Sequence, residues 1–156
     1  MSKAAARHDE VIETLNHLIE TCRDGQNGFL DSHQKIENPQ IREFCLEQSR
    51  NRGRFVGELQ QEVVHLGGDP ENLGSFSAAI HRSWINLKSV LGAGDYSILA
   101  ACEDGEEAAV NTYKSALQRH LPANLQSLIQ KQYVSIQESY HRTKHLKDSL
   151  NIRVKP

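Results

Sequence analysis

The residues best suited to chemistry are carboxylates on segments predicted to be helical. Glu138 and His141 are separated by two residues, a spacing that places metal ligands one helical turn apart. Glu106 falls within an apolar helical series and is followed two turns later by Tyr113. Carboxylate oxygens and imidazole nitrogens are suitable ligands for iron and related ions. These residues therefore raise the question of a metal site inside a helical protein.

Long helices are the elements that must position these residues. Apolar side chains recur at steps of three and four along four segments, the pattern of helices that bury one face. Asn38 and Pro39 predict the boundary between the first two helices, because Asn caps a helix and Pro fits its first position. The predicted inward series are Val11, Leu15, Leu18, Cys22, Gly25, Phe29, Ser32 and Ile36; Ile41, Cys45, Gln48, Arg52, Phe55, Leu59, Glu62 and Leu66; Leu99, Cys102, Glu106, Ala109, Tyr113 and Leu117; and Leu125, Ile129, Gln132, Ile136, Ser139, Thr143, Leu146 and Leu150.

These segments predict a single all-α domain over residues 1–156. Two helical hairpins, at about 8–67 and 95–151, are joined by a crossover with a short extra helix at about 75–91. A helix of about 17 residues spans roughly 25 Å, enough with its flanks to return along the bundle. The sequence Cys-Arg-Asp-Gly at 22–25 recurs as Cys-Glu-Asp-Gly at 102–105, which favours duplication of one hairpin over chance similarity between two amphipathic hairpins.

Composition excludes several classes of protein. The 156 residues are 38% hydrophobic and 24% charged, and no apolar run approaches the length of a membrane span. Eighteen Lys and Arg against 20 Asp and Glu leave no basic field of the kind that nucleic-acid binders use. The amino terminus lacks the apolar core of a secretory signal, so we expect a cytoplasmic protein with neither membrane nor nucleic acid as partner.

The arrangement resembles the ferritin-like superfamily and, more narrowly, an uncharacterised bacterial family within it. Two duplicated hairpins, a long crossover, and Glu106 with Tyr113 on the third long helix carry the broader similarity. The narrower one is carried by the segments 24–29, 66–70, 81–88 and 102–106. The resemblance implies a ferritin-like four-helix bundle, and it brings no established activity.

Ferritin-like enzymes hold two irons with a Glu from the first and third helices and a Glu-x-x-His pair from each of the other two. At the corresponding positions this chain keeps only Glu106 as an acid. The other counterparts are neutral: Gln26, Gln48 with Asn51, and Gln132 with Ser135. Glu138 lies roughly 120° around its helix from the apolar stripe and His141 almost opposite it, so both should face solvent or a partner chain. Tight di-iron binding is therefore not expected, and only Glu106, Glu103 and Glu47 remain as weak ligands.

An ionised carboxylate inside a bundle needs a partner, and Arg52 falls in the inward series of the second helix. We therefore expect a buried polar network in place of a metal centre. Its predicted members are Gln26, Gln48, Asn51, Arg52, Glu106, Tyr113, Gln132 and Ser135.

Two functions are compatible with these observations. The first is a non-enzymatic module, without a cofactor, that self-associates as a homodimer or binds another protein. In this interpretation Trp84 of the crossover is a core or interface anchor. The alternative is a metalloprotein that binds or oxidises iron through a non-standard carboxylate set, a di-iron-type oxidoreductase. A bundle that holds a small apolar ligand between its helices is a third possibility.

Overall fold

The computed structural model describes residues 3–70 and 84–154, and the regular structure within these ranges is entirely helical. The prediction of an all-α protein is confirmed. No helix in the described part of the chain has the combination of length and hydrophobicity that a membrane span requires. The helices are α1 (Lys3–Lys35), α2 (Pro39–His65), the short α4 (Ile85–Val90), α5 (Asp95–Leu117) and α6 (Ala123–Val154).

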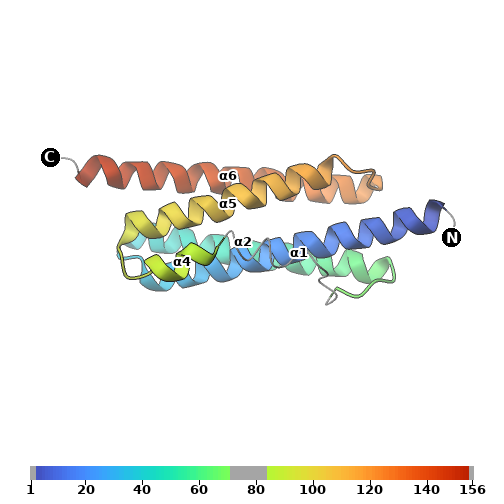
Figure 1. Cartoon of the computed structure of the whole chain (residues 1–156), viewed down its shortest axis with the longest axis horizontal. Helices are drawn as coiled ribbons and strands as arrows, with labels where there is room; N and C mark the ends of the chain where they lie inside the picture. Colours follow the sequence, from blue (N-terminus) through green and yellow to red (C-terminus); the bar gives the residue numbers. More distant parts are fainter. Residues whose placement is uncertain (1–2, 71–83, 155–156) are drawn as a thin grey trace.

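The four long helices lie lengthwise beside one another, and α4 lies alongside them near the start of α5 (Figure 1). Helices α1 and α2 pack together as an antiparallel pair, as do α5 and α6, while α1 also packs against α5. Helices α2 and α5 run in the same direction, so the chain between them connects opposite ends of the bundle. Of the predicted crossover helix at 75–91, residues 75–83 lie outside the described residues, and the described part is helical from Ile85 to Val90.

Polar side chains fix the turn between α1 and α2. The side-chain oxygen of Asn38 accepts hydrogen bonds from the backbone amides of Gln40 and Ile41 at 3.0 and 3.1 Å, and Pro39 is the first residue of α2. The Asp95 carboxylate at the start of α5 accepts from the backbone amides of Glu37 and Asn38 at 2.8 and 3.0 Å. The α1–α2 turn is thereby attached to the first turn of α5.

Most of the predicted inward residues are buried. The residues that are only partly buried lie at the ends of their series: Glu62, Leu66, Leu117, Leu146 and Leu150. The core has two apolar clusters. One contains Cys22, Phe55 and Tyr113, and the other contains Phe29 and Cys102. Between them lies a layer of buried polar side chains that includes Arg52 and Glu106, each flanked along its own helix by members of both clusters.

Trp84, immediately before α4, lies between two glycines on the long helices. A Cβ atom at Gly28 of α1 would lie 2.3 Å from the indole ring, and one at Gly105 of α5 would lie 2.2 Å from it. The ring also packs edge-on against Phe29, with centroids 5.5 Å apart. Because any side chain at either glycine would overlap the indole, these glycines form the seat of Trp84.

Candidate functional site

The most strongly built polar site is the ion pair between Arg52 of α2 and Glu106 of α5. Both guanidinium terminal nitrogens donate to the carboxylate, Nη1 to Oε1 at 2.6 Å and Nη2 to Oε2 at 2.7 Å. The side chains are only 1% and 0% exposed. The Ser139 hydroxyl of α6 donates to Glu106 Oε2 at 2.5 Å, so three helices meet at one carboxylate.

The surroundings of Arg52 stabilise its side chain in the charged form. Gly25 of α1 provides the space, because a Cβ atom there would lie 2.8 Å from Arg52 Nη1. The ring of Phe29 lies 5.6 Å from the guanidinium carbon, within the range of a cation–π contact. Burial by itself lowers the pKa of Arg52, but the charge and hydrogen bonds of Glu106 outweigh it, and the pKa lies above its ordinary value. The pair is a fixed, neutralised unit.

A second polar chain lies beside this pair. Tyr113 of α5 donates its hydroxyl to Gln132 Oε1 of α6 at 2.7 Å, and Gln132 Nε2 donates to Glu58 Oε1 of α2 at 3.1 Å. The tyrosine oxygen also lies 3.0 Å from the Cys22 sulfur of α1. All four long helices thus contribute to one hydrogen-bonded chain that leads from a buried thiol to a half-buried carboxylate.

The structure brings some of the predicted network residues together and not others. Arg52 contacts Glu106, and Tyr113 contacts Gln132, while Gln48 is buried nearby on the same face of α2 as Arg52. In contrast, the remaining three are only partly buried, and within the described residues none of their side chains hydrogen bonds to the ion pair. These three are Gln26, Asn51 and Ser135.

Gln26 lies on a different side of α1 from the residue that contacts Arg52. Gly25, the preceding residue, is the one that faces Arg52. Gln26 lies against α2 instead, where its backbone carbonyl accepts from Ser49 at 2.9 Å and its side chain lies beside Gly53. Successive helical residues point about 100° apart, so both cannot face the pair.

Three residues of these networks were not predicted from the sequence. Ser139 and Cys22 belong to the predicted inward series, and that position was the available signal for a buried polar contact. Glu58 lies one residue before Leu59 of its series and is half-buried, so periodicity alone gave no indication of its role.

The donor set does not fit a ferritin-type metal centre. Both oxygens of Glu106 are bound by Arg52, and the Glu103 carboxylate accepts from Lys147 Nζ at 2.5 Å. Glu47 is exposed on the outside of α2. Within residues 3–70 and 84–154, no three His, Cys, Asp or Glu side chains form a group that could hold an ion.

The Glu-x-x-His pair of α6 is also directed away from the bundle interior. Glu138 and His141 are both exposed, whereas Ser139 between them is buried. This placement follows from the helical period, which turns Ser139 toward the core. A site that used this pair would lie on the outer surface of the molecule.

The buried titratable groups near the pair are held in their neutral forms. Burial raises the pKa of Cys22 to about 11 and that of Cys102 to about 12. Burial and the neighbouring Cys22 raise the pKa of Tyr113 well above its ordinary value. These two thiols and the Tyr113 phenol are therefore protonated near neutral pH.

A search of curated proteins gives no match to this chain. The family model of a domain of unknown function, DUF2383, matches residues 10–119. This span contains α2, α4, α5 and most of α1, together with the Arg52–Glu106 ion pair, Gly25, and the glycine seat of Trp84. The chain belongs to the DUF2383 family.

Proposed function

We propose that this protein is a ferritin-like bundle of two duplicated hairpins in which a structural ion pair replaces the metal centre, and that it acts as a non-enzymatic module that self-associates. In this proposal the bundle supplies a rigid scaffold, and its outer surface supplies the function. The whole chain acts as one domain.

The Arg52–Glu106 pair is the observation that carries the proposal. A bidentate guanidinium uses both carboxylate oxygens, and Ser139 adds a third hydrogen bond to the same group. A metal ion would have to displace a buried cation that has no other carboxylate within hydrogen-bond distance in the described residues. Because stranding such a cation costs several kcal/mol, the pair favours a metal-free interior.

The face formed by α1 and α4 supports self-association. Ile85 is 63% exposed and, with Leu30, borders a hollow of about 550 Å³ beside Trp84. Asp31 and Lys88 also line this hollow, and within the described residues neither forms an ion pair. A second copy related by a twofold axis can bring Lys88 to Asp31 of the first while covering the apolar side chains. The face is therefore self-complementary in charge.

Metal content tests the first half of the proposal. The purified protein is incubated aerobically with ferrous iron, desalted and analysed by mass spectrometry for iron, beside a ferritin with an active ferroxidase centre. We expect well under one iron per chain. Two irons per chain would contradict the structural role of the ion pair and support an iron-oxidising protein.

Sedimentation velocity tests the second half. We expect a dimer for the parent protein and a monomer for Ile85→Glu, because the new charge would be buried in the interface. Val64→Glu is the matched control, since Val64 is 60% exposed on α2, away from this face, and its variant should remain dimeric. A parent protein that stays monomeric at high concentration would contradict self-association.

A further inference from the structure

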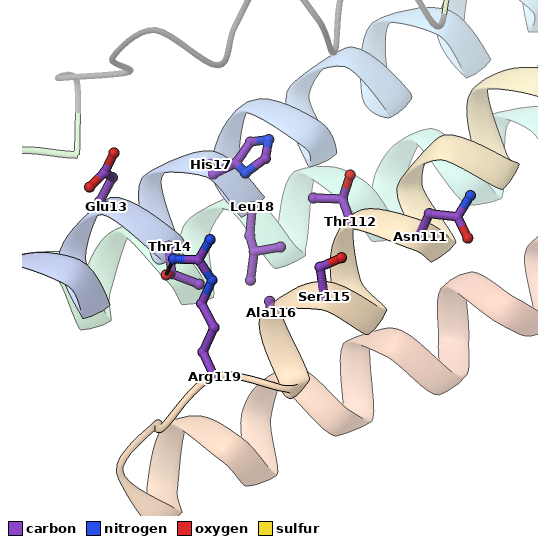
Figure 2. A pocket seen from close by; sticks show the side chains of 9 residues that line it. All are labelled: Glu13, Thr14, His17, Leu18, Asn111, Thr112, Ser115, Ala116 and Arg119. Atoms are coloured by element: carbon purple, nitrogen blue, oxygen red, sulfur yellow. Dashed lines mark hydrogen bonds between the residues drawn. The ribbon is translucent and has the colours of Figure 1, made fainter. Parts of the chain in front are cut away.

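Two adjoining hollows open between α1 and the C-terminal end of α5. Their volumes are about 240 and 400 Å³, and both are lined by Glu13, Thr14 and Arg119. Figure 2 shows the smaller one, with the Arg119 side chain reaching across it toward Thr14 of α1. The guanidinium therefore lies where the two hollows meet.

The positive charge of Arg119 has only a weak hydrogen-bond partner in this position. Its Nη1 donates to Thr14 Oγ1 at 3.4 Å, a long bond to a neutral acceptor. Within residues 3–70 and 84–154 it forms no ion pair, and Figure 2 shows the Glu13 carboxylate pointing away from it. An exposed guanidinium with unused N–H groups in a hollow is a receptor for an oxyanion.

The α5 wall of the smaller hollow carries groups suited to hydroxyls. Asn111 and Ser115 lie one helical turn apart on the same edge of α5, and both line the hollow. Thr112 donates its hydroxyl to the Ala108 carbonyl at 2.9 Å, so its oxygen is left to accept a hydrogen bond from a ligand. The apolar residues Leu18 and Ala116 form the buried base of the hollow, and the polar side-chain ends of α5 lie around it.

We propose that this cleft binds a small hydrophilic anion, a carboxylate or phosphate that also carries hydroxyl groups. The anionic group binds the Arg119 guanidinium, and the hydroxyls bind Asn111, Thr112 and Ser115. A volume of about 240 Å³ suits a molecule of sugar-acid or sugar-phosphate size. This site is independent of the ion pair and of the α1–α4 face.

Nuclear magnetic resonance titration of the full chain at low ionic strength tests the site. The probes are gluconate for the carboxylate, glucose 6-phosphate for the phosphate, and glucose as their neutral counterpart. We expect saturable shifts of the Asn111, Thr112 and Ser115 amide signals with at least one anion, and none with glucose. The anion whose titration saturates identifies the anionic group that the site binds. Absence of saturable shifts with both anions, or equal shifts with glucose, would overturn the proposal.

Three variants locate the binding. Arg119→Gln should raise the dissociation constant at least tenfold. Ser115→Glu should abolish binding, because it places a carboxylate in the cleft. Arg50→Gln, an exposed arginine on α2, is the matched control and should bind within twofold of the parent. Circular dichroism checks that each variant is folded. Unchanged affinity in folded Arg119→Gln or Ser115→Glu, or an equal loss in Arg50→Gln, would show that the anion binds elsewhere.

Discussion

At the scale of single residues, the buried ion pair illustrates how little an observed salt bridge says about net stability. Desolvating Arg52 and Glu106 is costly, and their bidentate bonds with Ser139 offset that cost. The geometry does indicate that removing one partner alone would lower the free energy of unfolding. The remaining charge would be buried where no other described residue neutralises it.

Single and double replacements separate the net contribution of the pair to stability from the cost of losing one partner. We expect Arg52→Met to lower the free energy of unfolding by about 3–5 kcal/mol, because the Glu106 carboxylate loses its cation. Arg52→Met combined with Glu106→Leu should recover most of that loss, since two apolar side chains of similar volume replace both charges. Urea unfolding followed by circular dichroism measures both. A loss below about 1 kcal/mol in the single variant would show that the pair has no such role.

His17 provides a prediction of pH dependence. Burial and the positive charge of Arg119 lower the pKa of His17, while Glu13 raises it in part. The folded state therefore disfavours the protonated imidazole, and this contribution to stability is present above pH 6.5 and is lost as the pH falls through the folded pKa. Imidazole titration by nuclear magnetic resonance should give a pKa for His17 below 6.5.

Two charge variants check the sign of that effect. Arg119→Gln should raise the pKa of His17, because the repelling charge is removed. Glu13→Gln should lower it further, because the attracting charge is removed. Shifts in the opposite directions would show that other groups control this imidazole.

At the scale of helices, the sequence predicts which faces are buried, and it does so for polar residues as well as apolar ones. Gln48, Arg52, Glu106, Gln132 and Ser139 all lie at predicted inward positions, and all are buried. The reason is that one period of 3.6 residues assigns a direction to every side chain of a straight helix. In the middle of each helix, burial can therefore be predicted from spacing without knowledge of the partner, whereas Glu62, near the end of its series, is only partly buried.

Contacts between helices are not determined by that period. The seat of Trp84 depends on how closely α1 and α5 approach the connecting segment, and a glycine in a sequence does not reveal which ring it admits. Gln26 likewise illustrates the limit, since the repeat alignment suggests a role that the rotation of α1 gives to Gly25. Distances and rotations between elements come from side-chain packing over the whole bundle.

Alanine substitutions at glycines test the seat of Trp84. Gly28→Ala and Gly105→Ala should each lower the free energy of unfolding by about 1–3 kcal/mol, because the new methyl group overlaps the indole. Trp84 is the single tryptophan, so its emission should also shift as the ring is displaced. Gly57→Ala is the matched control. Apart from its chain neighbours and the adjacent backbone of α2, no heavy atom lies within 4 Å of a Cβ there, and we expect the variant to stabilise α2 by about 0.5–1 kcal/mol.

At the scale of the whole molecule, the polar layer raises the question of whether the two apolar clusters unfold together. Arg52 and Glu106 connect α2 to α5 between the clusters, and the Tyr113–Gln132–Glu58 chain adds links among α5, α6 and α2. Breaking either cluster would expose these buried polar groups. We therefore expect the layer to couple the clusters into one cooperative unit.

The three cysteines report on this coupling because they are buried in both clusters, Cys22 in one and Cys45 with Cys102 in the other. Burial raises the pKa of all three thiols, so their reaction with a maleimide near pH 8 requires the protein to open. If the clusters open together, the three labelling rates in low urea should agree with one another and follow global stability. Mass spectrometry of labelled peptides measures each rate separately. Arg52→Met should accelerate all three alike, whereas faster labelling of Cys45 and Cys102 than of Cys22 would show that the second cluster opens alone and that the ion pair does not couple the two halves of the core.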